Sequence, residues 1–399
     1  MSNDRKSSLG LLTRAVEEVI VREHLEEALA SGRVLRVKLG IDPTAPDIHL
    51  GHTVPLRKLR QFQDAGHQAV LIIGDFTATV GDPSGRDDAR KSLTEREIAA
   101  NMEEYLAQAG KVIDLEKTEV RYNSEWYKKA GVGFLYDLLS KMTVQRALER
   151  DDFQKRIAEG RDLTVLEMIY PLLQGYDSVA VKADMELGGT DQKFNLLTGR
   201  KIQRRFGMEE QDVMTTWLIE GTDGSRKMSK SLGNYIGLRE SADEMFGKIM
   251  SVPDILIVKY FTALTDEPVA EITAMERGMA DGSMNPRDAK MRLAEAIAAA
   301  YHGVEEARRA RESFVRIFSK KEMPEEMEEK SVEARAWNIT DLLVRMGLAP
   351  SKGEARRLVE QGAVEVAGRV VTDPREDVVP KTGLVVRVGK RRFVKIRVL

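Results

Sequence analysis

The order of apolar segments near the N-terminus constrains the fold more than any other feature of the sequence. Residues 34–41 alternate in polarity and are rich in β-branched side chains, which predicts a strand. After a loop with two prolines, residues 52–65 carry apolar side chains at helical spacing, and Gly66 is well placed to end that helix. A short apolar strand follows at residues 69–73. This β–loop–α–β order predicts parallel strands, and therefore an α/β fold with a doubly wound, Rossmann-like sheet.

Later segments suggest how the rest of the chain is divided. Further strand candidates are residues 119–122, 179–185 and 213–219, with helical stretches between them. From about residue 243 to 318 the pattern is helical, with alanine-rich amphipathic segments such as residues 289–301. The chain has 399 residues, too many for one ordinary core. We therefore expect a sheet-containing domain at 1–240, a helical domain at 241–320, an acidic linker at 321–336 and a small α+β domain at 337–399.

Charge is distributed unevenly between these parts. Residues 337–399 contain 13 Lys and Arg residues against 7 Asp and Glu residues, whereas the whole chain has a formal net charge of −2. A small basic domain joined to an acidic body is typical of proteins that bind nucleic acid. A solvated basic surface explains the charge alone equally well.

Composition excludes several kinds of chemistry. The chain has no cysteine, so disulfides, thiolate nucleophiles and cysteine-ligated zinc are excluded. The N-terminus lacks the apolar stretch of a signal peptide, and no apolar run is long enough to cross a bilayer. We therefore expect a cytoplasmic protein without a membrane partner.

The sequence HLGH at residues 49–52 lies at the expected start of the first helix. Its two histidines, His49 and His52, are three residues apart and therefore share one helical face. Gly51 lets a flat ligand approach the backbone closely, and the helix N-terminus offers unpaired N–H groups to phosphate. Together these features suit a triphosphate site. Taken alone, the two histidines fit a metal pair or ordinary surface residues just as well.

The sequence KMSKS at residues 227–231 lies in a loop that contains several glycines. It follows a strand candidate and is bounded by Gly221, Gly224 and Gly233. Two lysines on a glycine-hinged loop, Lys227 and Lys230, can close over a polyphosphate and neutralise charge that develops there. An exposed basic loop is the alternative explanation.

The two motifs together, in this order, resemble the class I aminoacyl-tRNA synthetases, whose signatures bracket a nucleotide-binding fold. Four further stretches are similar to the tyrosyl-tRNA synthetases: GIDPTA at 40–45, GDPSG at 81–85, YPLLQGYD at 170–177 and GGTDQ at 188–192. The similarity runs nearly end to end and favours the form with an intact KMSKS motif. It implies an enzyme that activates tyrosine with ATP, releases pyrophosphate and transfers tyrosine to the 3′ end of its tRNA.

The resemblance also implies which residues form the site. The catalytic group that holds the phosphates would be Thr44, His49, His52, Lys227 and Lys230. The ATP-binding group would be Gly40, Asp42, His49, Gly51, His52, Asp191, Met228 and Lys230. The tyrosine-binding group would be Lys38, Asp82, Tyr170, Gln174, Asp177 and Gln192. Mg²⁺ would arrive with ATP as a substrate complex and would not occupy a tight protein site.

Three of the tyrosine-binding residues have a helical spacing. Tyr170, Gln174 and Asp177 occupy positions i, i+4 and i+7, which puts them on one face of a predicted helix. Core packing with a capping carboxylate is the alternative, but a core face seldom presents three polar groups. Asp177 would accept a hydrogen bond from the substrate phenol. Many family members have a tyrosine at the position of Lys38, so we interpret Lys38 as a substitute donor to that phenol.

The C-terminal part resembles a second known fold. Residues 339–346 and a segment that begins at Ser351 predict two helices, and a turn-linked β pair follows at 364–371. This order, with Lys352, Arg356 and Arg357 on the second helix, resembles the small RNA-binding fold of a ribosomal small-subunit protein, the alpha-L motif. It implies that residues 337–399 bind RNA.

The family resemblance assigns roles to the remaining parts. Within a catalytic domain at 1–240, an insertion at about 125–161 would form a homodimer interface, and the helical region 241–320 would contact the anticodon stem of tRNA-Tyr. Three alternatives are a tryptophanyl-type synthetase, a nucleotidyltransferase of the same superfamily that needs no tRNA, and a non-catalytic RNA-binding paralogue. The carboxylate at Asp177, the basic C-terminal domain and the intact motif residues favour the tyrosine enzyme over each of them.

Overall fold

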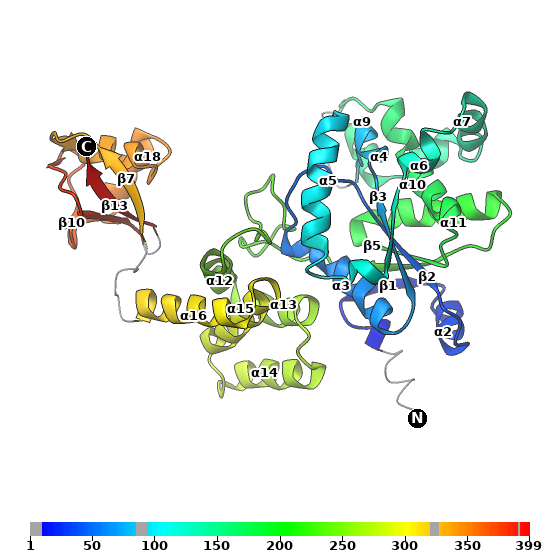
Figure 1. Cartoon of the computed structure of the whole chain (residues 1–399), viewed down its shortest axis with the longest axis horizontal. Coiled ribbons are helices and arrows are strands. Elements are labelled where there is room, and N and C mark those ends of the chain that lie inside the picture. The colour runs from blue at the N-terminus through cyan, green and yellow to red at the C-terminus, as the bar shows by residue number, and fades with distance from the viewer. Residues whose placement is uncertain (1–9, 85–93, 320–326, 390–391) are drawn as a thin grey trace. The chain divides into compact units, whose positions relative to one another are not determined.

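The computed structural model describes residues 10–84, 94–319, 327–389 and 392–399 (Figure 1). The chain divides into two compact units, residues 1–308 and 309–399. None of the helices in the described ranges combines the length and apolar character that a membrane span requires.

A sheet forms the centre of the first unit (Figure 1). It has six strands in the order β1-β6-β5-β2-β3-β4. Its strands are β1 (Val16–Ile20), β2 (Arg36–Ile41), β3 (Gln68–Ile73), β4 (Thr118–Tyr122), β5 (Met185–Gly189) and β6 (Asp212–Thr216). All neighbours are parallel except β1, which pairs antiparallel with β6 at the edge. The chain winds outward from β2 through β3 to β4 and then returns to β5 on the other side of β2. This reversal confirms the doubly wound α/β fold and favours a ligand site beyond the carboxyl ends of β2 and β5.

Helices connect these strands. The expected first helix is α3 (Leu50–Asp64), and Gly66 after it has a φ of +89°, which suits a residue without a side chain. Helix α10 (Val165–Ala180) packs closely on α11 (Lys193–Arg205). A Cβ on Gly175 would lie only 3.2 Å from the Cα of Gly199, so the absence of a side chain allows this close approach. The other elements in this part are α2 (Arg22–Ala30), α4 (Thr77–Val80), α5 (Glu95–Ala109), η1 (Leu115–Lys117), α6 (Ser124–Tyr127), α7 (Val132–Leu139), α8 (Val144–Ala147), α9 (Asp151–Ala158) and η2 (Thr190–Gln192).

The expected strand at residues 179–185 is wrong. Helix α10 continues to Ala180, and the strand begins only at Met185. The apolar run at 179–181 comprises the last two residues of the helix, which are partly buried, and the C-cap Val181, which is 2% exposed. A short apolar run of this kind does not distinguish a buried helix end from a strand. The edge strand β1 was not expected from the sequence.

The segment expected to be helical is helical in the structure. It contains α12 (Ala242–Ser251), η3 (Asp254–Leu256), α13 (Ile257–Leu264), α14 (Val269–Asp281), α15 (Pro286–His302) and α16 (Val304–Ser319). Helix α15 contacts α12 and α13, and α13 contacts α3 of the sheet-containing part. Most of this helical segment therefore belongs to the same compact unit as the sheet.

The second unit has its own apolar core beneath a five-stranded sheet with the order β10-β9-β12-β13-β7. Its elements are β7 (Glu328–Val332), β8 (Trp337–Asn338), α17 (Ile339–Arg345), α18 (Lys352–Glu360), β9 (Val364–Val366), β10 (Arg369–Val371), β11 (Asp377–Val378), β12 (Val385–Val388) and β13 (Arg392–Val398). The two expected helices and the β pair are present. Part of the expected linker is structured, because β7 pairs in parallel with β13 and buries Val332.

Candidate active site

The HLGH segment begins helix α3, as the sequence predicts. His49 is the N-cap, and its backbone N–H donates to Nδ1 of His52 at 3.3 Å. The two rings stack with their centroids 3.7 Å apart. A Cβ on Gly51 would lie 3.0 Å from the His49 ring, so glycine also makes room for this stack. Within the described ranges, no group of three or more His, Asp or Glu side chains is arranged to hold a metal ion, so the histidine pair lacks a third protein ligand there.

Both histidines are uncharged at neutral pH. Burial, together with nearby His52 and Lys230, lowers the pKa of His49 to about 2. Burial and the two lysines of the KMSKS loop lower the pKa of His52 to about 4. A neutral imidazole can donate one N–H and accept at its other nitrogen. The pair therefore offers hydrogen bonds, and the positive charge of this region comes from Lys227 and Lys230.

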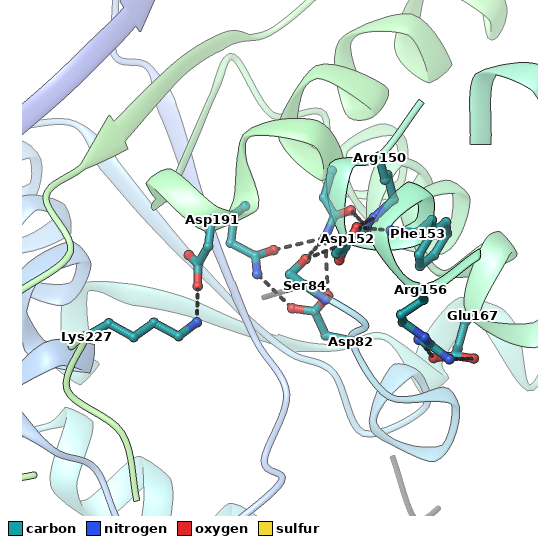
Figure 2. Close-up of polar contacts among 11 residues, drawn as sticks. Asp82, Ser84, Arg150, Asp152, Phe153, Arg156, Glu167, Asp191 and Lys227 are labelled. Carbon is teal, nitrogen blue, oxygen red and sulfur yellow. Dashed lines mark hydrogen bonds and ion pairs between the residues drawn. The ribbon is translucent and has the colours of Figure 1, made fainter. Parts of the chain in front are cut away.

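The KMSKS loop meets the HLGH segment, although the two are far apart in sequence. A β-bridge joins His49 to Gly237 just beyond the loop, and the N–H of Leu50 donates to the carbonyl of Ile236 at 2.9 Å. Lys230 donates to the carbonyl of Asp47, and burial lowers its pKa. On the other side, Nζ of Lys227 lies 3.3 Å from the Asp191 carboxylate (Figure 2).

Met228 anchors the middle of this loop. Its side chain is buried, and its N–H donates to the carbonyl of Ile219 at 2.8 Å. The lysines on either side therefore extend from a fixed point, one toward Asp47 and the other toward Asp191.

The carboxyl end of β2 provides an open strip of backbone. Gly40 is exposed, and a Cβ there would meet nothing within 4 Å. Asp42 follows, and its carboxylate accepts hydrogen bonds from the Tyr170 hydroxyl at 2.9 Å and from Thr77 Oγ1 at 2.7 Å. The N–H of Thr44 donates to the carbonyl of Asp42 at 2.7 Å, which turns the chain toward α3.

The three polar residues predicted to share one helical face all lie on α10, but each has different partners. Tyr170 reaches Asp42, and burial, with the charges of Asp42 and Asp82, raises the pKa of its phenol well above the ordinary value. Gln174 Nε2 donates to Glu186 at 3.2 Å. Asp177 accepts hydrogen bonds from Trp126 Nε1 at 3.0 Å and from Asn123 Nδ2 at 3.3 Å. Burial raises the pKa of Asp177 to about 6.

Asp82 and Gln192 form a direct pair. Gln192 Nε2 donates to one oxygen of the Asp82 carboxylate at 2.7 Å (Figure 2). The other oxygen accepts from the N–H of Ser84 at 2.9 Å and lies 3.4 Å from Asn195 Nδ2. The hydrogen-bond donors around Asp82 are therefore neutral amide groups.

Lys38 is fully buried, and its ammonium is already engaged. It forms an ion pair with Glu186 at 2.9 Å, and it donates to the carbonyl of Gln174 at 2.9 Å and to Ser178 Oγ at 2.8 Å. These contacts use the three donors of an ammonium group. Lys38 therefore ties α10 to β5 and has no proton left to donate to a substrate phenol in this arrangement.

Several residues of this region were not indicated by the sequence. Glu186 is one, although it lies opposite Lys38 in the parallel register of β2 and β5. The misplaced strand at 179–185 hid this pairing of opposite charges. Asn123, Trp126 and Asn195 are others, and only the tertiary fold brings them to Asp177 and Asp82.

The three basic residues assigned to RNA binding, Lys352, Arg356 and Arg357, lie on helix α18, as expected. Lys352 and Arg356 line a pocket. Its other lining residues are Thr340, Gly353, Pro374 and Arg375. Arg357 is exposed on the same helix and pairs with Glu354 at 2.7 Å. Lys352 pairs with Asp341 at 2.6 Å, and Arg356 with Glu360 at 2.8 Å. Arg375, which follows β10, adds a positive charge that the sequence did not single out.

The histidine-containing HLGH segment and the lysine-containing KMSKS loop meet beyond the carboxyl edge of the doubly wound sheet. This combination defines a class I aminoacyl-tRNA synthetase. The sequence matches the family described as tRNA synthetases class I (W and Y) over residues 30–319 and the S4 domain over residues 339–382. The chain therefore belongs to this synthetase family.

Relatives identify the branch of the family. The chain is 51% identical over 393 residues to the tyrosine–tRNA ligase of Moorella thermoacetica, covering 97% of this chain and 95% of the relative. It is 52% identical over 386 residues to that of Thermotoga maritima, covering 97% and 96%. The protein is accordingly a tyrosine–tRNA ligase, and the tryptophan-type and tRNA-independent alternatives are set aside.

Solved structures support the same fold. A C-terminally truncated mitochondrial tyrosyl-tRNA synthetase from Aspergillus nidulans has a TM-score of 0.65 at 23% identity, covering 78% of this chain and 94% of that one. A tryptophanyl-tRNA synthetase from Plasmodium falciparum has a TM-score of 0.59 at 14% identity, covering 77% and 89%. At these identities the likeness shows the fold alone.

Proposed function

We propose that the site beyond β2 and β5 joins tyrosine to ATP and then passes tyrosine to tRNA-Tyr. The observation that carries this proposal is the meeting of the HLGH segment and the KMSKS loop next to the Asp82–Gln192 pair. Cationic and N–H donors thus lie beside acceptors that suit an ammonium group, as a reaction between a nucleotide and an amino acid requires.

In the first step, a tyrosine carboxylate oxygen attacks the α-phosphorus of ATP. A bond forms between that oxygen and phosphorus, the bond to the β-phosphate bridging oxygen breaks, and pyrophosphate leaves with the electron pair. In the second step, a hydroxyl oxygen of the terminal tRNA ribose attacks the carbonyl carbon of the tyrosyl-adenylate. The new ester C–O bond forms, the bond from that carbon to the phosphate oxygen breaks, AMP leaves with the electron pair, and the hydroxyl proton is released. No enzyme nucleophile is needed, so the side chains act by positioning and by stabilising charge.

The phosphates would be held by Thr44, the two histidines and the two lysines. Neutral His49 and His52 would donate N–H groups from the start of α3, where the helix dipole also favours anions. Lys227 and Lys230 would exchange their contacts with Asp191 and Asp47 for phosphate oxygens as negative charge moves to the leaving group. Gly40, Asp42, Gly51, Asp191 and Met228 would line the rest of the ATP site.

Tyrosine would lie between α10 and the Asp82–Gln192 pair. Its ammonium would contact Asp82, Tyr170 and Gln174, and its phenol would donate to Asp177. A buried acceptor that phenylalanine left unpaired would cost free energy, so Asp177 supports discrimination between the two amino acids. Lys38 would act on this side indirectly, because its contacts fix Gln174 and Glu186.

Mg²⁺ would enter with ATP as part of the substrate. Magnesium commonly binds proteins through substrate phosphates and retains several waters. A substrate complex of this kind requires no separate cage of protein ligands. Because ATP and tRNA are its substrates, we place the enzyme in the cytoplasm.

The second unit and the helical segment would bind tRNA, and the insertion would form a homodimer. Four apolar side chains of α7 are exposed at helical spacing, namely Val132 (65%), Leu135 (40%), Tyr136 (69%) and Leu139 (36%). An apolar stripe of this kind is typical of a subunit interface. Tyr136→Glu should shift the sedimentation of the protein toward a monomer, and an unchanged oligomer would argue against this interface.

ATP–pyrophosphate exchange with each of the twenty amino acids tests the activity itself. Tyrosine should support the highest kcat/KM, and charging of tRNA-Tyr should follow when tRNA is added. A different best amino acid, or exchange without any tRNA charging, would overturn the proposal.

A further inference from the structure

Arg150 is a buried cation next to the proposed tyrosine site but outside the set of residues that would contact the substrate. It is the N-cap residue of α9, within the insertion, and is 4% exposed. Its Nε and Nη2 bind the two oxygens of the Asp152 carboxylate at 3.0 and 2.8 Å. The guanidinium also lies over the Phe153 and Phe194 rings, 4.7 and 5.3 Å from their centroids.

The same guanidinium reaches toward Asp82 through two neutral side chains (Figure 2). Nη1 donates to Asn195 Oδ1 at 2.8 Å, and Nη2 donates to Ser84 Oγ at 3.1 Å. Asn195 Nδ2 in turn donates to Gln192 Oε1 at 3.0 Å, and Gln192 Nε2 donates to Asp82 at 2.7 Å. Asn195 is fully buried, so water does not replace these bonds.

This chain of hydrogen bonds has a fixed direction. A guanidinium can only donate, so Asn195 must turn its oxygen to Arg150 and its amide N–H groups to Gln192. Gln192 must then present its oxygen to Asn195 and its N–H groups to Asp82. The Asp82 carboxylate can only accept, so it holds the amides from the other end of the chain. Without Arg150, the buried Asn195 oxygen loses its donor, and the Asn195–Gln192 pair is no longer held in place from the side of the insertion.

The charge arrangement keeps Asp82 available for an ammonium ion. The positive charge of Arg150 is matched by Asp152, and Asp82 is approached by the neutral amides of Gln192 and Asn195 and the N–H of Ser84. An arginine paired directly with Asp82 would compete with the substrate ammonium. Here Arg150 orients the donors around Asp82 and leaves the carboxylate charge unneutralised.

We propose that Arg150 is a positioning residue for tyrosine: through Asn195, it sets the orientation of Gln192 and Asp82 at the ammonium subsite. This proposal rests on the proposed function of Asp82 and Gln192 in binding tyrosine. Its effect should therefore appear in the binding of the ammonium group and not in the binding of ATP.

Arg156 provides a matched control on the same helix. It is 2% exposed, and its Nη1 pairs with Glu167 at 2.6 Å, away from Asp82 (Figure 2). The substitutions Arg150→Lys and Arg156→Lys both keep a buried positive charge and both lose the planar fork of donors. A general effect on folding should appear in both variants.

The test measures KM for tyrosine and for ATP by pyrophosphate exchange, together with Tm. Loss of a hydrogen bond to a charged group predicts that Arg150→Lys raises KM for tyrosine by about tenfold and leaves KM for ATP within about twofold. Arg156→Lys should lower Tm and leave both KM values within about twofold of wild type. An unchanged KM for tyrosine in Arg150→Lys would overturn the proposal.

A tyrosine analogue without the ammonium group separates positioning from a loose pocket. The inhibition constant of 3-(4-hydroxyphenyl)propionate should be the same for Arg150→Lys and wild type, because this molecule has no group for Asp82. Equal losses for tyrosine and for the analogue would overturn the proposal. If Arg150→Lys does not fold, Asn195→Leu carries the same test, since a neutral apolar side chain of similar size can neither accept from Arg150 nor donate to Gln192.

Asp82→Asn distinguishes this proposal from the function on which it rests. If Asp82→Asn leaves KM for tyrosine unchanged, the assigned role of Asp82 is wrong. If Asp82→Asn raises it and Arg150→Lys does not, the site stands and the role of Arg150 is wrong.

Discussion

At the scale of single residues, the proposed contact between Asp177 and the substrate phenol would make tyrosine recognition depend on pH. Burial raises the pKa of this carboxyl to about 6, so it is ionised above that pH and protonated below it. The ionised carboxylate accepts hydrogen bonds at both oxygens, so it can accept one from the substrate phenol, whereas the protonated carboxyl carries an O–H donor on one oxygen. We therefore expect kcat/KM for tyrosine to fall as pH drops through about 6.

Asp177→Asn isolates this effect. The amide does not titrate in this range, so the part of the acid limb that depends on tyrosine should disappear, and kcat/KM at pH 8 should be about tenfold lower. Pyrophosphate exchange between pH 5 and 8 measures both. An acid limb that persists unchanged in the variant would assign the titration to another group.

Replacing Lys38 should affect the stability of the protein as well as tyrosine binding. Lys38 and Glu186 are both fully buried, so Lys38→Met would leave a carboxylate without its cation. Breaking a buried pair in this way costs about 3–5 kcal/mol of unfolding free energy. KM for tyrosine should also rise, because Gln174 loses its support.

The double variant Lys38→Met with Glu186→Gln tests whether charge is responsible. Removing both charges should restore most of the unfolding free energy measured by urea denaturation, because no unpaired ion remains. Equal stability of the single and double variants would show that packing, and not charge, decides the cost.

The sequence indicated Lys38 as a site residue but not its partner. Strand β2 was predicted from its alternation, whereas Glu186 fell outside the strand expected at 179–185. Arg150 was hidden for a similar reason: its contacts with Ser84 and Asn195 join residues distant in sequence. Local patterns predict which face a residue occupies, but long-range partners depend on strand order and helix packing.

At the scale of elements, the sequence was most informative where a motif coincides with an element boundary. The HLGH segment begins α3 and Gly66 follows its end, so capping and periodicity agreed. The strand β7 was missed because five residues with three charges form an exposed edge strand. Its pairing with β13, and not its own composition, holds it in the sheet.

For the KMSKS loop, we predict the effect of removing one of its lysines, Lys230. Lys230 now contacts the carbonyl of Asp47 and would move onto phosphate during adenylate formation. Lys230→Ala should slow adenylate formation by about 100-fold or more, because charge stabilisation is lost mainly in the transition state. The dissociation constant for tyrosine should stay within about twofold.

Lys259→Ala is a suitable control for this loop. Lys259 is also partly exposed and pairs with a carboxylate, Glu220, at 2.9 Å. Rapid-quench measurement of adenylate and equilibrium binding of tyrosine should show little change in this variant. Equal losses of rate and tyrosine affinity in Lys230→Ala would contradict a transition-state role.

At the scale of the whole molecule, two units with separate cores suggest separable tasks. The first unit contains both motifs and the Asp82–Gln192 pair, and the second buries its own apolar residues around α17 and α18. Activation of tyrosine should therefore depend on the first unit alone, whereas tRNA charging should also need the basic surface of the second.

Charge reversal in the full chain tests this division. Lys352 and Arg356 line a pocket and are exposed, so reversing both to Glu should leave the fold intact. Loss of phosphate contacts should raise KM for tRNA-Tyr by about tenfold and weaken its dependence on salt, because fewer counterions are released on binding. Tyrosine-dependent pyrophosphate exchange should not change. Lys395→Glu reverses a half-exposed, ion-paired lysine on β13 and changes the net charge by −2, half of the −4 of the double variant. If that control raises KM for tRNA as much as the double variant, general electrostatic attraction explains binding, and helix α18 has no specific role.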